Sequence, residues 1–452
     1  MTSTLAQAPP SRHFLETMLT TAAEFTPGQQ VRRAPARQNT QRRLPRLKSK
    51  RALTLGILIF GVYLFVVHSN KINIGSATIA IGLFAVLLYE RPLRTAPQLN
   101  WYVAFLVWSL IAVPSSISPN DSFLAWVDAA KILLIMYFMF NIIRTPDQHR
   151  LITLAWLGMF ALSPARGTLF NFLYGFHTAG RYAWNFQFAN FNDMAALTLI
   201  PLALSLERLR SNDKPWVKVC ALAGVVSLPF IILITQSRAG MLGLAAMLLF
   251  LLARSRYRKR LAVATCSVGL VALLFAPQSV WDRITGMQYL TSVETLNQSD
   301  SSAEQRYLIW QVAEKIIADN PIIGVGIGVY GRVHEVYASN RFEWALAGGP
   351  RDTHNTYLHV LAETGVVGLF FFLMIFVSSY YELVKAARSV KDSAIVGAKQ
   401  LRDRCQTYQA ALVGLSVCAI FGSMENMVFP FLLVALAAAS VRITWKAGDV
   451  KR

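Results

Sequence analysis

Long uninterrupted apolar runs dominate the chain from about residue 52 onward. Within them the apolar positions neither alternate nor recur at the spacing of one helix face, so they are typical of helices surrounded by lipid. A helix of about 20 apolar residues crosses the hydrocarbon core of a bilayer. The pattern predicts an all-α, polytopic membrane protein with about twelve transmembrane helices. The runs are 52–68, 72–89, 101–118, 122–143, 151–165, 192–206, 217–235, 239–253, 261–276, 355–379, 407–423 and 427–443.

The net charge of +20 would indicate a nucleic-acid partner in a soluble protein. Here its distribution favours another explanation. If the N-terminus is cytoplasmic, the inner segments, counted with Lys218 and Arg442 at the inner ends of two runs, hold 33 of the 44 Lys and Arg residues and the outer segments hold 10, with Lys131 inside a helix. This asymmetry is the positive-inside pattern, which predicts that both termini are cytoplasmic. No nucleic-acid partner is expected, and membrane lipids surround the helices.

The spacing of the runs predicts five regions. Residues 1–50 form a disordered basic cytoplasmic tail, 51–276 hold helices 1–9, 277–353 form a large periplasmic loop, 354–443 hold helices 10–12, and 444–452 form a cytoplasmic tail. Long loops in a compact protein usually carry function. Residues 303–318 of the large loop have an amphipathic helical pattern, predicting a helix on the outer membrane surface or over a cavity, which Asn320 and Pro321 end.

A glycine-rich turn follows this amphipathic segment. Gly326, Gly328 and Gly331 match the GxGxxG pattern of dinucleotide-binding proteins. That pattern binds a pyrophosphate only within a strand-turn-helix unit, and no such unit is expected here. We therefore interpret the glycines as a loop turn and expect no cofactor.

His354 lies where the large loop meets an apolar run, with Glu363 further along that run. We expect Thr353 to cap the helix, and the positive end of the helix dipole would keep the imidazole neutral and able to accept a proton. The alternative is an interfacial histidine that only bonds lipid headgroups or a loop carbonyl. Glu363 could orient an arginine or bond a neighbouring helix. Asp128 and Lys131 are expected to neutralise each other on one helix face.

Four arginines, Arg181, Arg238, Arg306 and Arg351, fall on the predicted outer side, where cations are otherwise few. A guanidinium group binds phosphate oxygens with two parallel hydrogen bonds, which suits a lipid diphosphate. The alternative for each is a contact with headgroups or with an acidic side chain. The outer acids show no Asp-x-Asp and no histidine pair with ligand spacing, so no metal is expected.

Several motifs follow one another along the chain. They are Arg181 with the Asn-rich stretch 185–193, Ser-Arg-Ala-Gly at 237–240, Arg-Tyr-Leu-Ile-Trp at 306–310, the Asn-Pro turn at 320–321 with its glycines, and His-Asn-Thr-Tyr-Leu at 354–358 followed by Glu-Thr-Gly at 363–365. In this order they resemble the O-antigen ligase family of bacterial inner membranes, and the resemblance spans roughly 180–375. Some O-antigen and exopolysaccharide polymerases share this signature region.

The resemblance implies a glycosyltransferase of the inner membrane. Its members transfer a glycan from undecaprenyl diphosphate to a hydroxyl of the lipid A-core oligosaccharide at the periplasmic face. His354 would be the general base, and Arg238 and Arg306, helped by Arg181, would hold the diphosphate, without metal and with inversion of the anomeric centre. Arg351 has no clear match in the family pattern. A polymerase of the same superfamily is the first alternative and a transporter of lipid-linked sugars the second.

Overall fold

The computed structural model describes residues 53–69, 75–89, 92–178, 180–255, 301–339, 349–390 and 397–449, with 259, 263 and 267 singly. The expected tail at 1–50, almost all of the run 261–276 and the segment 277–300 lie outside the described residues. Where the structure is described, every regular element is a helix, apart from one bridge between Thr178 and Arg181. This confirms the all-α class for that part of the chain.

Each expected apolar run except 261–276 overlaps a helix. The elements are α2 (Leu55–Ser69), α3 (Gly75–Tyr89), α4 (Pro97–Ala112), α5 (Pro119–Ile142), α6 (Pro146–Phe160), η1 (Ala161–Ala165), α7 (Arg166–Leu173), η2 (Phe186–Phe188), α8 (Phe191–Arg210), α9 (Pro215–Ile234), α10 (Arg238–Arg254), α14 (Ser301–Asp319), α15 (Tyr330–Ser339), α16 (Thr356–Ser389), α17 (Ala398–Cys418) and α18 (Val428–Asp449).

Within the described residues, four helices are both long and apolar enough to cross a membrane: α5, α9, α16 and the first 18 residues of α18. Helices α2 and α3 are as apolar but shorter, with 15 residues each. These lengths and compositions identify a membrane protein. The count of twelve crossings stays a prediction.

Local sequence explains where several helices begin. Proline fits the first turn of a helix, where its missing N–H is not needed, and α5, α6 and α9 begin at Pro119, Pro146 and Pro215. At α6 Thr145 also forms a capping box with Gln148. Residues in the first turn therefore favour the observed N-terminal ends of these helices.

Helix α18 is the most enclosed of the four candidate spans, with 78% of its 18-residue window buried. It packs against α5, α16, α17, α6, α8 and α4. Its centre holds small buried side chains, which let neighbouring helices approach closely: Ala435, Ala437, Ala438, Ala439 and Ser440. Glycines do the same between α10 and α17, where a Cβ on Gly243 would lie 2.8 Å from the carbonyl oxygen of Gly414.

One end of this bundle is held by a buried ionic network. Glu207 on α8 accepts a hydrogen bond from Nε of Arg404 at 2.6 Å and another from the hydroxyl of Tyr408 at 2.9 Å, both from α17. Nε2 of His149 on α6 contacts that Tyr408 hydroxyl at 3.0 Å and the hydroxyl of Ser440 on α18 at 2.9 Å. Buried polar contacts therefore join the four helices α6, α8, α17 and α18.

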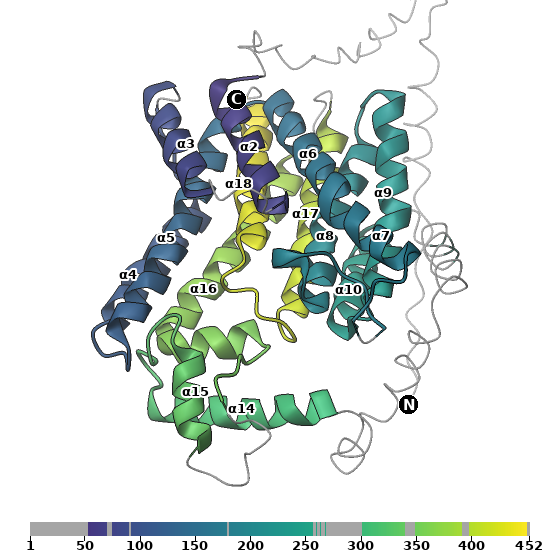
Figure 1. The fold of residues 1–452 in the computed structure, drawn as a ribbon. Coiled ribbons are helices and arrows are strands. Elements are labelled where there is room, and N and C mark those ends of the chain that lie inside the picture. The colour runs from purple at the N-terminus through teal and green to yellow at the C-terminus, as the bar shows by residue number, and fades with distance from the viewer. Residues whose placement is uncertain are drawn as a thin grey trace, which may run out of the picture. The chain divides into compact units, whose positions relative to one another are not determined.

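The predicted amphipathic helix is confirmed as α14, which ends directly before Asn320. Its apolar face does not lie open: Ile309, Val312 and Ile316 are buried against Val329 and Val333. Helices α14 and α15 pack on each other and on α16 (Figure 1). Helices α14 and α15 therefore pack against α16, and His354 lies just before the first residue of that helix.

Candidate active site at the start of helix α16

Asn355, and not Thr353, caps α16. The side chain of Asn355 accepts hydrogen bonds from the backbone N–H groups of Tyr357 and Leu358, at 3.0 and 3.2 Å. The expectation that Thr353 is the cap is therefore wrong. Both residue types suit this role, but the hydroxyl of Thr353 instead donates to the carbonyl of Asn355 and closes the turn around His354.

His354 has a left-handed backbone, with φ of 48°. A residue other than glycine seldom adopts this backbone conformation, which costs on the order of 1–3 kcal/mol and is often found at functional sites. Its N–H donates to Oδ1 of Asp352 at 3.2 Å. The surrounding turn therefore imposes an unfavourable conformation that orients a half-buried imidazole.

Partial burial lowers the pKa of His354, and the positive charges of Arg306, His359 and Arg351 add to this effect against the opposing charge of Asp352. The imidazole is therefore in its neutral form near pH 7. The helix dipole was expected to keep it neutral, but burial is the largest cause in the structure. Its proposed role as a general base stays a prediction.

Asp352 connects this turn to two other segments. Its Oδ1 accepts a hydrogen bond from the hydroxyl of Ser423 at 2.7 Å and lies 3.2 Å from Nδ1 of His359. Burial opposes the ionised carboxylate, but the contacts with His359 and Ser423 outweigh it and hold the pKa of Asp352 below its usual value. The carboxylate that orients the His354 backbone is therefore itself fixed from two sides.

His359 and Glu425 were not found from the sequence as site residues. Nε2 of His359 lies 3.1 Å from Oε1 of Glu363 and 3.9 Å from Oε1 of Glu425. Burial, with repulsion from Asp352 and Glu363, raises the pKa of Glu425 to about 7. The spacing of four residues between His359 and Glu363 is visible in the sequence, whereas Glu425 comes from a distant loop.

Glu363 bonds the start of helix α15. Its Oε1 accepts the backbone N–H of Tyr330 at 3.1 Å and so holds the first residue of α15. The Tyr330 ring lies 5.1 Å from the His359 ring. Of the two interpretations of Glu363, bonding to a neighbouring helix is therefore confirmed.

The glycine-rich turn packs against a break in α16. Gly365 has φ of 66° and ψ of −176°, so α16 is two helical pieces joined there. The N–H groups of Val325 and Gly326 donate to the carbonyls of Ala362 and Glu363, and that of Val366 donates to Pro321. A Cβ on Gly326 would lie 2.7 Å from Ser116. The glycines therefore serve close packing, as expected for a structural turn.

The four predicted arginines fall into two groups. Arg306 and Arg351 lie close enough to His354 to disfavour its protonated form. Arg181 lies elsewhere: its Nε donates to the carbonyl of Thr235 at 2.9 Å and its Nη2 to Asn192 at 3.4 Å. Arg238 is the first residue of α10.

Asn192 and Asp193 lie in the first turn of α8, between Arg181 and the carboxylates around His359. Oδ1 of Asn192 also accepts the hydroxyl of Ser237, the cap residue that precedes Arg238, at 2.8 Å. Asp193, the next residue, is close enough to Asp352 and Glu425 to be repelled by both. In the first turn of α8, Asn192 therefore contacts Arg181, and Asp193 lies near the carboxylates that surround His359.

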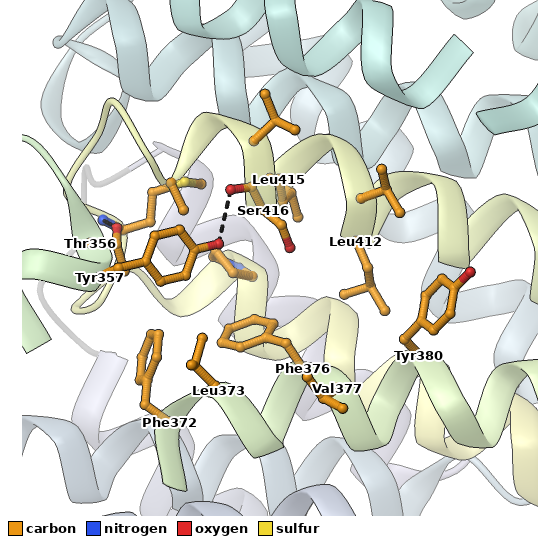
Figure 2. A pocket seen from close by; sticks show the side chains of 15 residues that line it. Thr356, Tyr357, Phe372, Leu373, Phe376, Val377, Tyr380, Leu412, Leu415 and Ser416 are labelled. Atoms are coloured by element: carbon orange, nitrogen blue, oxygen red, sulfur yellow. Dashed lines mark hydrogen bonds between the residues drawn. The ribbon is translucent and has the colours of Figure 1, made fainter. Parts of the chain in front are cut away.

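An apolar cavity of about 360 Å³ begins beside this site, between α16 and α17. Figure 2 shows Tyr357 at one end and Tyr380 at the other, with Phe372, Phe376 and Leu412 between them. The hydroxyl of Tyr357 donates to the carbonyl of Ser416 at 2.9 Å. Because Tyr357 is three residues from His354, the cavity leads from the polar site along an apolar helix face.

The fold and site define an all-α membrane protein with a polar site where loop helices meet a membrane helix. Residues 223–373 match the family model described as O-antigen ligase. The chain is also similar to the exopolysaccharide production protein ExoQ of Rhizobium meliloti (strain 1021), 24% identical over 353 residues, which cover 73% of this chain and 76% of ExoQ. Residues 223–373 are therefore similar to the O-antigen ligase family, and this segment holds Arg238, Arg306, Arg351 and His354 but not Arg181.

Proposed function

We propose that the chain is a glycosyltransferase that moves a glycan from undecaprenyl diphosphate to an acceptor hydroxyl at the periplasmic face of the bacterial inner membrane. The observation that carries this proposal is that the family-matched segment brings His354 and the arginines Arg306 and Arg351 to one site. A base beside guanidinium groups suits the transfer of a sugar from a phosphate leaving group.

In the proposed reaction the acceptor oxygen attacks the anomeric carbon while its proton passes to His354. The bond between that carbon and the diphosphate oxygen breaks, and the diphosphate leaves with the electron pair. Arg306 and Arg238 stabilise the charge that develops on it, with Arg181 and Arg351 adding positive potential. Direct displacement inverts the anomeric centre, and no metal contacts the diphosphate.

The apolar cavity supports a lipid-linked donor. It starts three residues from His354 and is lined almost wholly by apolar side chains of α16 and α17. We propose that the first isoprene units next to the diphosphate lie there. This arrangement would hold the reacting end of the lipid beside His354 while the rest of its chain stays in the bilayer.

The acceptor proposed first is the lipid A-core oligosaccharide, which makes the protein an O-antigen ligase. Similarity to ExoQ across about three quarters of both chains favours a second candidate, a polymerase that extends a lipid-linked repeat. Both reactions require the same base and the same arginines. They differ in the molecule that supplies the hydroxyl.

Purified full-length protein in nanodiscs, given undecaprenyl-diphosphate glycan with or without lipid A-core, tests both candidates. Glycan on lipid A-core supports the ligase, and a ladder of longer lipid-linked glycans in the absence of lipid A-core supports the polymerase. If the protein consumes neither substrate while it binds both, the glycosyltransferase proposal is wrong.

A further inference from the structure

His359 has a carboxylate at each ring nitrogen. Nδ1 lies 3.2 Å from Oδ1 of Asp352, and Nε2 lies 3.1 Å from Oε1 of Glu363. A protonated imidazole donates to both of them, whereas a neutral imidazole has one N–H and can donate to only one. A metal ion would take the place of the second proton. If that N–H is on Nε2 and bonds Glu363, then Nδ1 and the Asp352 oxygen face each other with lone pairs, an arrangement that a cation between them stabilises.

Glu425 adds a third carboxylate with a free oxygen. Its side chain is 8% exposed, and its Oε2 has no hydrogen-bond partner within the described residues. A buried carboxylate oxygen without a donor is costly. Asp193 brings a fourth acidic group close to Asp352 and Glu425. Negative charge therefore gathers around one imidazole.

We propose that Asp352, His359 and Glu425 bind a divalent metal cation. One ligand atom from each lies within 4.8 Å of the others. Two ligands about 2.1 Å from one ion and roughly at right angles lie about 3 Å apart, which fits the 3.2 Å between Asp352 and His359. One imidazole with two carboxylates suits Mn²⁺ or Zn²⁺.

The surrounding contacts also fit a metal site. Metal-binding histidines usually donate their other ring N–H to a carboxylate, which fixes the orientation of the ring. Glu363 is in that position at Nε2 of His359. Glu363 is in turn held by the N–H of Tyr330. The ring would therefore present Nδ1 to the ion.

The cation would join three separate segments: the turn that carries His354, the first turns of α16, and the residues between α17 and α18. These segments already meet where the N–H of Thr356 donates to the carbonyl of Gly422 at 3.0 Å. The ion would stabilise this junction without contacting the diphosphate. The inference therefore does not depend on the proposed transfer reaction.

The test uses purified full-length protein, stripped with a chelator and held in an uncharged detergent without substrate. Mn²⁺ binding is followed by electron paramagnetic resonance, and Zn²⁺ binding by metal analysis after dialysis. Glu425→Gln removes the ligand charge at nearly constant shape, and Glu335→Gln, at an exposed position on α15, is the matched control. Asp352→Asn is measured as well, so that the test does not depend on the folding of one variant.

We expect about one ion per chain in the wild type and in Glu335→Gln. Binding should weaken at least ~10-fold in Glu425→Gln and Asp352→Asn, and the ion should raise the melting temperature of the wild type and of Glu335→Gln but not of these two variants. Wild-type protein without a bound ion, or equal binding in all variants, would overturn the proposal, and a proton would then account for the carboxylate cluster. That result would leave the glycosyltransferase proposal unaffected, because the test measures ion binding and melting temperature and not glycan transfer.

Discussion

Asp352 holds the backbone of His354 through a hydrogen bond from the His354 N–H to Oδ1, 3.2 Å long. This contact stabilises a residue with φ of 48°, so the side chain with the proposed chemistry is placed by the carboxylate two residues before it. The same carboxylate also contacts His359 in α16 and Ser423 in the loop between α17 and α18. The predictions below test the site and the topology that it requires.

The first prediction concerns His354 itself. His354→Asn should lose on the order of 10²–10⁴-fold in turnover, because an amide cannot accept the acceptor's proton. Asparagine tolerates a left-handed backbone, so this change should leave the turn intact. Ligation rate and lipid-diphosphate affinity are measured in nanodiscs, and the affinity should change little.

His177→Asn, in an exposed part of the 166–191 connection, is the control for this substitution and should keep normal turnover. If His354→Asn turns over near the wild-type rate, then His354 only positions the substrate. The base would in that case belong to another group, or the reaction would need none.

The second prediction concerns the arginines. Arg306→Lys and Arg238→Lys should be nearly as damaging as the corresponding alanine variants, because lysine keeps the charge but cannot form two parallel bonds to phosphate. Arg332→Lys is the control, since Arg332 pairs with Asp121 at 2.5 Å and is not part of the proposed site. Donor binding and transfer rate report the effect.

Normal transfer by Arg306→Lys or Arg238→Lys, at normal levels in the membrane, would reduce that arginine to a charge contact with headgroups. Arg181 should respond less sharply than Arg306, because two of its donors already bond Thr235 and Asn192.

The third prediction concerns Gly365. Gly365→Ala should lower the melting temperature by roughly several degrees, because a side chain there is strained at φ of 66°. Its Cβ would also clash with the carbonyl oxygen of Ile322. Gly158→Ala, inside α6 with open space around it, should be neutral or slightly stabilising. Equal melting temperatures for the two variants would contradict the break in α16.

The fourth prediction concerns topology. The charge asymmetry puts residue 307 outside and residue 214 inside. In a variant without native cysteines, Tyr307→Cys should react with a membrane-impermeant maleimide in intact cells, and Lys214→Cys should react only after the membrane is opened. Both side chains are exposed. The reverse pattern would move the proposed site to the cytoplasm and exclude a periplasmic reaction.

The sequence predicts those features that depend on nearby residues. The apolar runs locate the helices, the amphipathic pattern locates α14, and the pair of Asp128 and Lys131 forms as expected, with Nζ 2.7 Å from Oδ1. Each depends on spacing within a few turns of one helix.

Two features were missed, one local and one that depends on long-range packing. The cap at Asn355 could not be told from one at Thr353, because both residue types suit the role. The group of Asp352, His359 and Glu425 forms only when the loop between α17 and α18 returns to the start of α16. Such a meeting of segments about 70 residues apart leaves no periodic signal in one sequence.

The break at Gly365 separates α16 into a short first piece and a long second piece. The short piece is tied to the glycine-rich turn through Val325 and Gly326 and to the α17–α18 loop through Thr356. The long piece meets the bilayer, whose thickness varies between membranes and is matched by helix tilt. We expect a change of tilt to be taken up at the glycine, so that the distance between His354 and its neighbours depends little on the lipid composition in which the protein works.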